Sequence, residues 1–174
     1  RLVELVLRES RAVVRADRAR GILITETSHG YVCANAGIDA SNVEAHDQVT
    51  LLPSDPDASA RRVIEELRGE VPGVDLGVVV TDTFGRAWRE GQVNFAIGVA
   101  GLEPIRDYRG TRDRSGREMA VTRIAVADEI AGSAELVMGK TDGVPVAIVR
   151  GYGYTPSDAG SAPLIRDRST DLFR

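Results

Sequence analysis

One short stretch of this sequence combines side chains that bind metal ions with side chains that bind phosphates. Asp82 and Thr83 follow residues 76–80, an apolar and β-branched run that predicts a buried strand, so we expect both at the strand's carboxyl end. Gly85 would then let the chain turn, and Arg86 would add a positive charge. Divalent cations prefer oxygen ligands, and guanidinium groups bind phosphates. The stretch therefore predicts a site for a cation and a phosphate.

A second acidic loop lies at residues 35–42. Asp39 follows Gly37 in this loop, and Asn42 comes three residues later. Asp39 could be a metal ligand with Asn42 near a nucleotide, but Asp and Asn also stabilise ordinary turns by bonding to their own backbone. Asp82 has the same alternative as a turn carboxylate. From the residues alone, both interpretations stay open.

The arginines and the tryptophan near Asp82 also have two interpretations each. Arg86, Arg89 and Arg109 could bind phosphates, but solvated surface arginines are commoner and their isolated charges contribute little. Trp88 could stack on a ring, although a lone tryptophan more often packs into a core.

Gly139, Lys140 and Thr141 resemble the end of a phosphate-binding Walker loop. The full motif requires a glycine where this sequence has Ala134, and here the segment follows a predicted helix instead of preceding one. We therefore reject a Walker loop, but Lys140 could still lie near a phosphate.

The elements that must position these residues alternate loosely between helix and strand. The sequence predicts helices at residues 1–16, 55–68 and 124–138, strands at 22–27, 31–34, 48–52, 76–80, 92–99 and 144–149, and a polar loop or hairpin at 104–117. Hairpins within this order favour an α+β fold with mixed or antiparallel sheets and packed helices.

Composition narrows the classes of function. The chain has 174 residues, 43% of them hydrophobic, which suffices for one compact core. Its net charge of −4 argues against binding nucleic acid through bulk charge, and no apolar run approaches the roughly 20 residues of a membrane helix. The single cysteine, Cys33, is compatible with a reducing compartment. We expect a cytoplasmic protein with neither nucleic acid nor membrane as a partner.

Seven segments, in order, resemble the coenzyme F420-0:γ-glutamyl ligase family. They read CANAGIDASN at 33–42, TDTFGRAWREGQ at 81–92, AIGVAG at 96–101, DYRG at 107–110, VADE at 126–129, LVMG at 136–139 and PVAIVRG at 145–151. The resemblance implies a ligase domain at residues 1–151 and a C-terminal extension or linker at 152–174. Family members have a further N-terminal stretch with nucleotide-binding residues, so we expect part of the domain to be missing here.

The resemblance implies a GTP-dependent and metal-dependent ligase. GTP would phosphorylate the terminal carboxylate of coenzyme F420-0, and the amine of L-glutamate would attack the acyl phosphate. Later rounds would add γ-linked glutamates. Two divalent cations, Mg²⁺ or Mn²⁺, would brace the phosphates, with K⁺ as a further candidate ion. The family fold implies an intertwined homodimer without a Walker loop.

The resemblance also assigns roles by position. Asp39 and Asp82 would hold one metal ion, Thr83 would hold a second, and Asn42 would contact the nucleotide. The expected nucleotide segment consists of Met138, Gly139, Lys140, Thr141, Asp142, Gly143 and Val144. Asp82 is the expected catalytic residue. We infer independently of the resemblance that Arg86 is a second catalytic residue, which would bind the substrate or a phosphate. Lys140 stands where some relatives have an oxygen ligand, and an ammonium group cannot coordinate a cation.

Two other functions compete with the ligase. A metal-dependent phosphohydrolase would use the same aspartates and release phosphate without an amide product. A non-catalytic dimerisation fragment would fit a chain that starts within a predicted helix.

Overall fold

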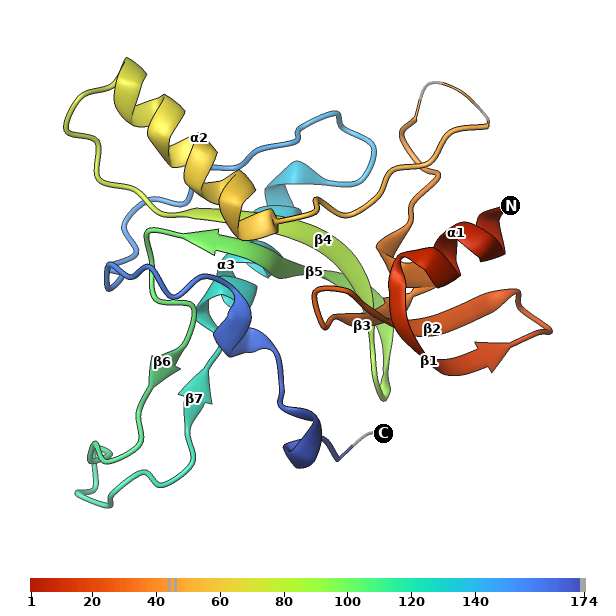
Figure 1. The fold of residues 1–174 in the computed structure, drawn as a ribbon. Helices are drawn as coiled ribbons and strands as arrows, with labels where there is room; N and C mark the ends of the chain where they lie inside the picture. The colour runs from red at the N-terminus through yellow and green to blue at the C-terminus, as the bar shows by residue number, and fades with distance from the viewer. Residues whose placement is uncertain (44, 46, 173–174) are drawn as a thin grey trace. The chain divides into compact units, whose positions relative to one another are not determined.

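The computed structural model of the chain describes residues 1–43, 45 and 47–172. These residues form two compact units (Figure 1). Unit 1 comprises Arg1–Ser54, Thr83–Val93 and Ile165–Arg174, and unit 2 comprises Asp55–Asp82 and Asn94–Leu164.

Unit 1 is built on a three-stranded antiparallel sheet with the order β1-β2-β3. Its elements are α1 (Leu2–Arg8), β1 (Ser10–Asp17), β2 (Ile22–Thr27), β3 (Val32–Ala34) and the short 3-10 helices η1 (Asn35–Gly37) and η3 (Arg168–Thr170). The prediction of one helix over residues 1–16 is wrong beyond Arg8. Pairing with β2 gives residues 10–17 a strand conformation, which outweighs the local helical pattern.

The strand predicted at residues 48–52 is also wrong. Only one isolated bridge forms there, between Thr50 and Asp39, with N–H···O distances of 2.8 and 3.2 Å. Pro53 follows directly and cannot donate a ladder hydrogen bond, which limits a strand at this place.

Helix α2 (Pro56–Glu70) begins unit 2 and confirms its predicted start. The Asp55 side chain accepts a hydrogen bond from the Ala58 N–H at 2.8 Å, and Pro56 occupies the first turn. The buried side chains of Ala60 and Ile64 then pack against Ala100 of β5.

Strand β4 (Val78–Arg86) pairs with β5 (Arg89–Ala100) in a two-stranded sheet. The sequence predicts that the first of these strands ends at Val80, and this boundary is wrong. The β-branched threonines and the pairing with β5 carry the strand on through Asp82 and Thr83, so both lie inside β4 and not at its carboxyl end.

The remaining elements of unit 2 are β6 (Arg106–Asp107), β7 (Arg123–Ile124), α3 (Val126–Met138) and the 3-10 helix η2 (Ala162–Leu164). β6 and β7 form an antiparallel hairpin. The sequence suggested a hairpin within residues 104–117, and its second strand lies beyond that range. On α3, the small side chains of Ala127 and Ala131 are fully buried. Together these elements confirm an α+β fold with antiparallel sheets.

The buried strand predicted at residues 144–149 is wrong. The segment forms no strand, and its apolar side chains are exposed, with Val146 at 71% and Ile148 at 75%. The later tail is better packed, because the Tyr154 hydroxyl donates to Asp75 Oδ1 at 2.6 Å. No helix of the described residues is long and apolar enough to cross a membrane.

Candidate functional site

Asp39 forms an ordinary turn in which its side chain accepts hydrogen bonds from nearby residues, as one of the two interpretations predicts. Its Oδ1 accepts a hydrogen bond from the Ser41 N–H at 2.7 Å, and its Oδ2 accepts one from the Ser41 hydroxyl at 2.6 Å. A carboxylate has about four lone-pair sites, so these two bonds alone do not use all of them. The side chain is half-buried, so a ligand from solvent can approach it. The turn thus orients the carboxylate and remains compatible with a metal-ligand role.

Asn42 lies on the same loop, at the surface. Its φ of 54° is in the left-handed region, which Asn tolerates better than most residues. Asn35, at the start of the loop, anchors it to the sheet by accepting a hydrogen bond from the Leu23 N–H at 3.0 Å. The loop therefore has a defined backbone course between two fixed points, Asn35 and the bridge at Asp39.

Asp82 and Thr83 are half-buried neighbours on β4. Successive side chains of a strand point to opposite faces, so one ion on one face cannot take both side chains as ligands. This alternation is compatible with the expected assignment to two different ions. Asp82 belongs to unit 2 and Asp39 to unit 1, and their joint role at one ion stays a prediction.

The chain reverses between β4 and β5 later than predicted. Gly85 has no positive φ and stays in the strand, whereas Trp88 adopts a φ of 63° in the turn. Trp88 is 85% exposed, so the interpretation of a core tryptophan is wrong. Arg86 Nη2 donates across the turn to the Glu90 carbonyl at 2.9 Å, while its Nε is buried without a hydrogen-bond acceptor among the described residues. Arg86 thus stabilises the β4–β5 hairpin, and its buried Nε–H remains available to donate a hydrogen bond.

Arg109 is held by a carboxylate of its own hairpin. Its Nε donates to Asp107 at 2.9 Å, and this side-chain hydrogen bond is the largest cause that lowers the pKa of Asp107 to about 2. The paired arginine favours the surface interpretation over a phosphate grip.

The expected nucleotide segment begins at the C-terminal end of α3. Gly139 is the C-cap, with φ 61° and ψ 169°, a combination that essentially only glycine adopts. A Cβ at this position would also collide with the Asp142 carboxylate. Gly143 has a φ of 67°, and the intervening side chains are exposed. The segment forms one contiguous loop after α3. The sequence likewise predicted that this segment follows a helix.

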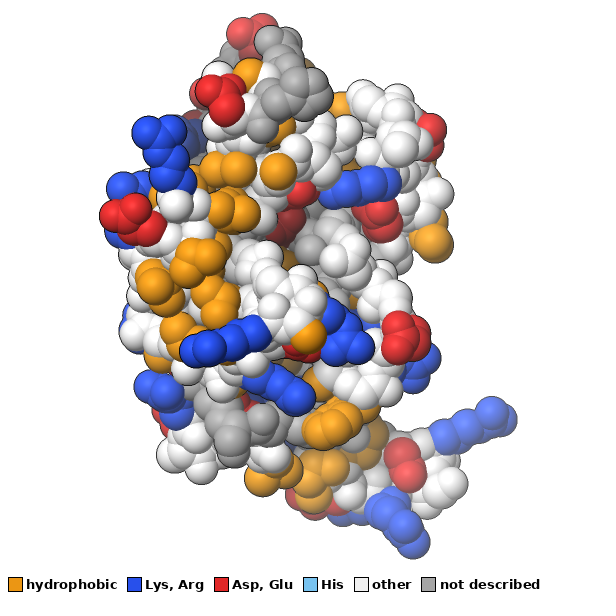
Figure 2. All heavy atoms as spheres, turned by 90° about the vertical axis from the view of Figure 1, so that its right-hand side faces the viewer, with side chains coloured by type: hydrophobic (Ala, Val, Ile, Leu, Met, Phe, Trp, Pro, Cys, Tyr) orange, Lys and Arg blue, Asp and Glu red, His pale blue; other side chains and the backbone are white. Residues whose placement is uncertain are grey.

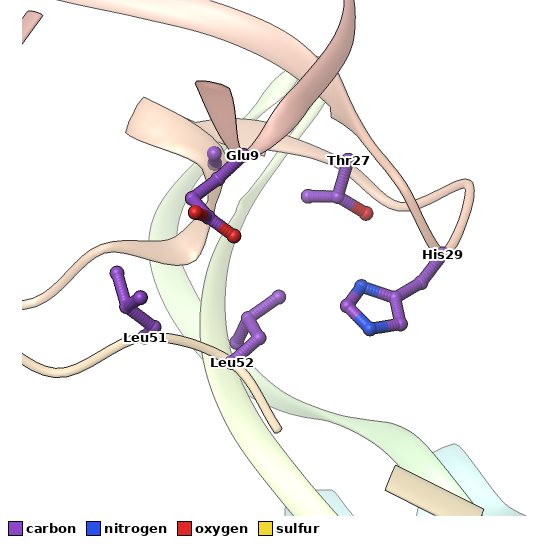
Figure 3. A pocket seen from close by; sticks show the side chains of 6 residues that line it. Glu9, Thr27, His29, Leu51 and Leu52 are labelled. Carbon is purple, nitrogen blue, oxygen red and sulfur yellow. The ribbon is translucent and has the colours of Figure 1, made fainter. Parts of the chain in front are cut away.

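Unit 1 contains a small cavity that the sequence did not predict. It measures about 10 Å³, room for about one water molecule. Its lining residues are Glu9, Thr27, His29, Ala36, Leu51 and Leu52 (Figure 3). The His29 and Glu9 side chains point into it, and His29 Nδ1 is buried without a hydrogen-bond partner among the described residues. Glu9 follows α1 and His29 lies in the turn after β2, so no local motif could reveal the pair.

No three His, Cys, Asp or Glu side chains within residues 1–43, 45 and 47–172 form a cluster that could hold a metal ion. The predicted ligands Asp39, Asp82 and Thr83 include one hydroxyl and come from both units. Carboxylate and hydroxyl oxygens are hard donors, and this chemistry fits Mg²⁺ or Mn²⁺.

The chain was compared with known proteins. A sequence model of the F420-0:Gamma-glutamyl ligase family matches residues 1–151. The coenzyme F420:L-glutamate ligase of Methanothermobacter thermautotrophicus is 51% identical, over 99% of this chain and 68% of the relative. The ligase of the same name from Methanopyrus kandleri is 45% identical over 100% of this chain and 69% of its own length. That of Methanocaldococcus jannaschii is 39% identical, with 100% and 68% covered.

Proposed function

The chain belongs to the F420-0:γ-glutamyl ligase family, as the sequence resemblance predicted, and from this premise we propose that it joins L-glutamate to coenzyme F420-0 at the expense of GTP. The observation that carries the proposal is the match of the family over residues 1–151, together with 51% identity to a coenzyme F420:L-glutamate ligase. The protein is then a cytoplasmic ligase of coenzyme F420 biosynthesis.

The proposed reaction has two chemical steps. The terminal carboxylate of F420-0 attacks the γ-phosphorus of GTP, so that an acyl phosphate forms and GDP leaves. The amine of L-glutamate then attacks the acyl carbon, an amide bond forms, and inorganic phosphate leaves with the bonding electron pair. A proton from the amine is released to solvent. Repetition on the new γ-carboxylate gives γ-linked glutamates.

Oxygen ligands on unit 1 and on β4 would hold two divalent cations, Mg²⁺ or Mn²⁺, with K⁺ as a third candidate ion. Asp39 and Asp82 would bind one and Thr83 the other. The Ser41 hydrogen bonds fix the Asp39 carboxylate in one orientation before any ligand arrives, which lowers the entropy lost on binding. When bound, the cations would neutralise charge on the transferred phosphoryl group.

The loop at residues 138–144 would bind the nucleotide together with Asn42. The positive φ angles at Gly139 and Gly143 set the course of a loop whose residues 139–144 are exposed. Lys140 would then contribute charge to a phosphate. Arg86, with one buried Nε–H lacking an acceptor, supports our assignment of a substrate or phosphate contact there.

A homodimer is part of the proposal, and exposed apolar surface supports it. Val146 and Ile148 are 71% and 75% exposed in a segment of strand-like composition. Hydrophobic side chains also lie at the surface among arginines and acids on the face drawn in Figure 2, and α1 exposes Leu2 and Val3. Exposed apolar surface of this kind marks interaction sites.

Trapping with hydroxylamine tests the acyl phosphate. If glutamate is replaced by hydroxylamine, GTP and F420-0 should give the hydroxamate of F420-0 together with GDP. GDP formation without F420-0 would instead support the metal-dependent phosphohydrolase. Glutamate transfer without any trapped hydroxamate would contradict the acyl-phosphate step.

A further inference from the structure

The hairpin of β6 and β7 differs in charge from the rest of the chain. Residues 106–124 contain six arginines and three acids, a net charge of +3, whereas the whole chain carries −4 and the remainder therefore −7. In Figure 1 this hairpin extends away from α2 and α3. We call residues 106–124 the basic arm. Its positive charge is not evident from the net charge of the whole chain, which is negative.

The arm is ordered by its own backbone bonds. Tyr108 N–H donates to the Thr122 carbonyl at 3.0 Å, and Asp113 N–H donates to the Arg117 carbonyl at 2.9 Å. At the tip, Asp113 Oδ1 accepts hydrogen bonds from the Ser115 and Arg117 N–H groups at 2.8 and 2.9 Å. Because the turn exists before binding, little backbone entropy is lost when a ligand engages it.

The positive charge is shared along the arm, and the tip at residues 112–118 has three arginines and two acids, Asp113 and Glu118, a net charge of +1. Asp107 pairs with Arg109 and also with Arg123, the latter at 3.8 Å. In contrast, the exposed arginines of the tip, Arg114 and Arg117, make no ion pair with any described residue. The planar guanidinium suits carboxylates, which it can bind through two parallel hydrogen bonds.

From this arrangement we propose that the tip of the β6–β7 hairpin binds the oligo-γ-glutamate tail of the substrate during later rounds of ligation. This inference rests on the proposed function. A γ-linkage consumes the side-chain carboxylate and leaves the α-carboxylate of each glutamate unpaired, so every round adds one negative charge to the tail. A chain of carboxylates is the partner that fits a positively charged arm with two unpaired arginines, Arg114 and Arg117, at its tip.

The position of the arm restricts its effect to longer tails. β7 leads into the N-terminal end of α3, and the proposed nucleotide loop follows its C-terminal end. α3 has 13 residues, which places its two ends roughly 20 Å apart at 1.5 Å per residue. A tail that grows at the nucleotide loop therefore reaches the arm only after several additions, and the first addition is independent of the arm.

The test compares two charge-matched double variants. Arg114→Gln with Arg117→Gln removes the tip charges, and Arg62→Gln with Arg68→Gln removes two exposed charges of α2 in the same unit. Titration calorimetry with γ-linked tetraglutamate, without GTP and at low salt, measures the affinity. One exposed ion pair contributes a factor of about two to five, so the tip variant should bind about ten-fold more weakly and the α2 variant within two-fold of wild type.

Product analysis supplies the second readout. With GTP and L-glutamate, the tip variant should add the first glutamate at the wild-type rate but give shorter tails, as seen by mass spectrometry. Unchanged tetraglutamate affinity, or equal losses in both variants, would overturn the proposal. So would tighter binding of an RNA tetranucleotide, which would assign the arm to nucleic acid. A wild type that adds no glutamate would contradict the proposed function, while the titration would still decide the role of the arm.

Discussion

Asp82 is the residue on which the proposed chemistry depends most. It is half-buried within β4, and Asp82→Asn preserves its shape while removing the charge that a cation requires. We expect the kcat of glutamate ligation to fall by about 10²–10³, the scale of losing one strong electrostatic contact. The thermal midpoint should change little. Steady-state kinetics and calorimetry measure the two quantities.

The matched control is Asp158→Asn, which removes an exposed carboxylate of the same unit. It should leave kcat unchanged. Wild-type rates in Asp82→Asn would show that the metal assignment is wrong.

Gly139 offers a second test with a control on the same helix. Gly139→Ala would force alanine into φ 61° and ψ 169° and bring a Cβ against Asp142, at a cost of about 1–3 kcal/mol in loop conformation. We expect the KM for GTP to rise about ten-fold or more, because the loop must rearrange. Gly132→Ala, inside α3 with open space around its Cβ, should leave KM unchanged and stabilise the fold by up to about 1 kcal/mol. Equal effects of both variants on KM would contradict a nucleotide role for the loop.

Local rules predicted several residue roles correctly. The helix predicted to begin at residue 55 and the helix predicted to end at residue 138 do so at Asp55 and Gly139, which cap them, because caps depend on adjacent backbone that a short sequence pattern encodes. The cavity between Glu9 and His29 depends on how α1 meets the turn after β2, so no local pattern indicates it. The hydrogen bonds from Ser41 to Asp39 fit the turn chemistry that the sequence suggested as an alternative.

At the scale of elements, Asp128 joins α3 to β5. Its Oδ1 accepts a hydrogen bond from the Ala96 N–H at 2.9 Å, and desolvation raises its pKa above the ordinary value. Between the ordinary pKa of an aspartate and the raised pKa, the folded state therefore binds more protons than the unfolded state at Asp128. This contribution to the free energy of unfolding should fall as pH rises through the raised pKa, and then stay constant.

Asp128→Asn should remove this fall. The amide oxygen still accepts the Ala96 bond and carries no charge, so the free energy of unfolding at pH 7 should equal or exceed that of wild type. Asp128→Ala should lower it by about 1–3 kcal/mol, because a part-buried N–H loses its acceptor. Urea unfolding between pH 4 and 7 measures all three proteins. If the stability of wild type relative to Asp128→Asn does not fall across this range, the account of Asp128 is wrong.

The elements that the sequence predicted wrongly share a physical cause. Residues 10–17 look helical alone but pair with β2, and residues 144–149 look like a strand but find no pairing partner in the described chain. β4 runs to Arg86 because β5 pairs with it beyond the apolar stretch that marks its start. Strand formation depends on a partner strand, which periodicity does not identify.

At the scale of the whole molecule, the exposed segment at 144–149 makes the homodimer testable. Val146→Asp with Ile148→Asp places two charges on side chains that are 71% and 75% exposed. If this segment lies in a subunit interface, burial of those charges should weaken the dimer by about 100-fold or more. Sedimentation velocity over a concentration series measures the dissociation constant.

Val121→Asp is the control, because Val121 is 83% exposed in the same unit but lies on the β6–β7 hairpin. It should leave the dimer intact. A wild-type protein that sediments as a monomer at every concentration, or a dimer indifferent to the double substitution, would contradict this interface.

The most direct test of the account is the mass of the product. The protein is incubated with F420-0, L-glutamate, GTP and Mn²⁺ or Mg²⁺, and the deazaflavin product is analysed by mass spectrometry, with GTP or metal omitted in parallel. We predict a gain of one glutamyl unit, followed by further units, only when GTP and metal are both present. Release of phosphate from GTP with no gain in the mass of F420-0 would contradict it and support the phosphohydrolase.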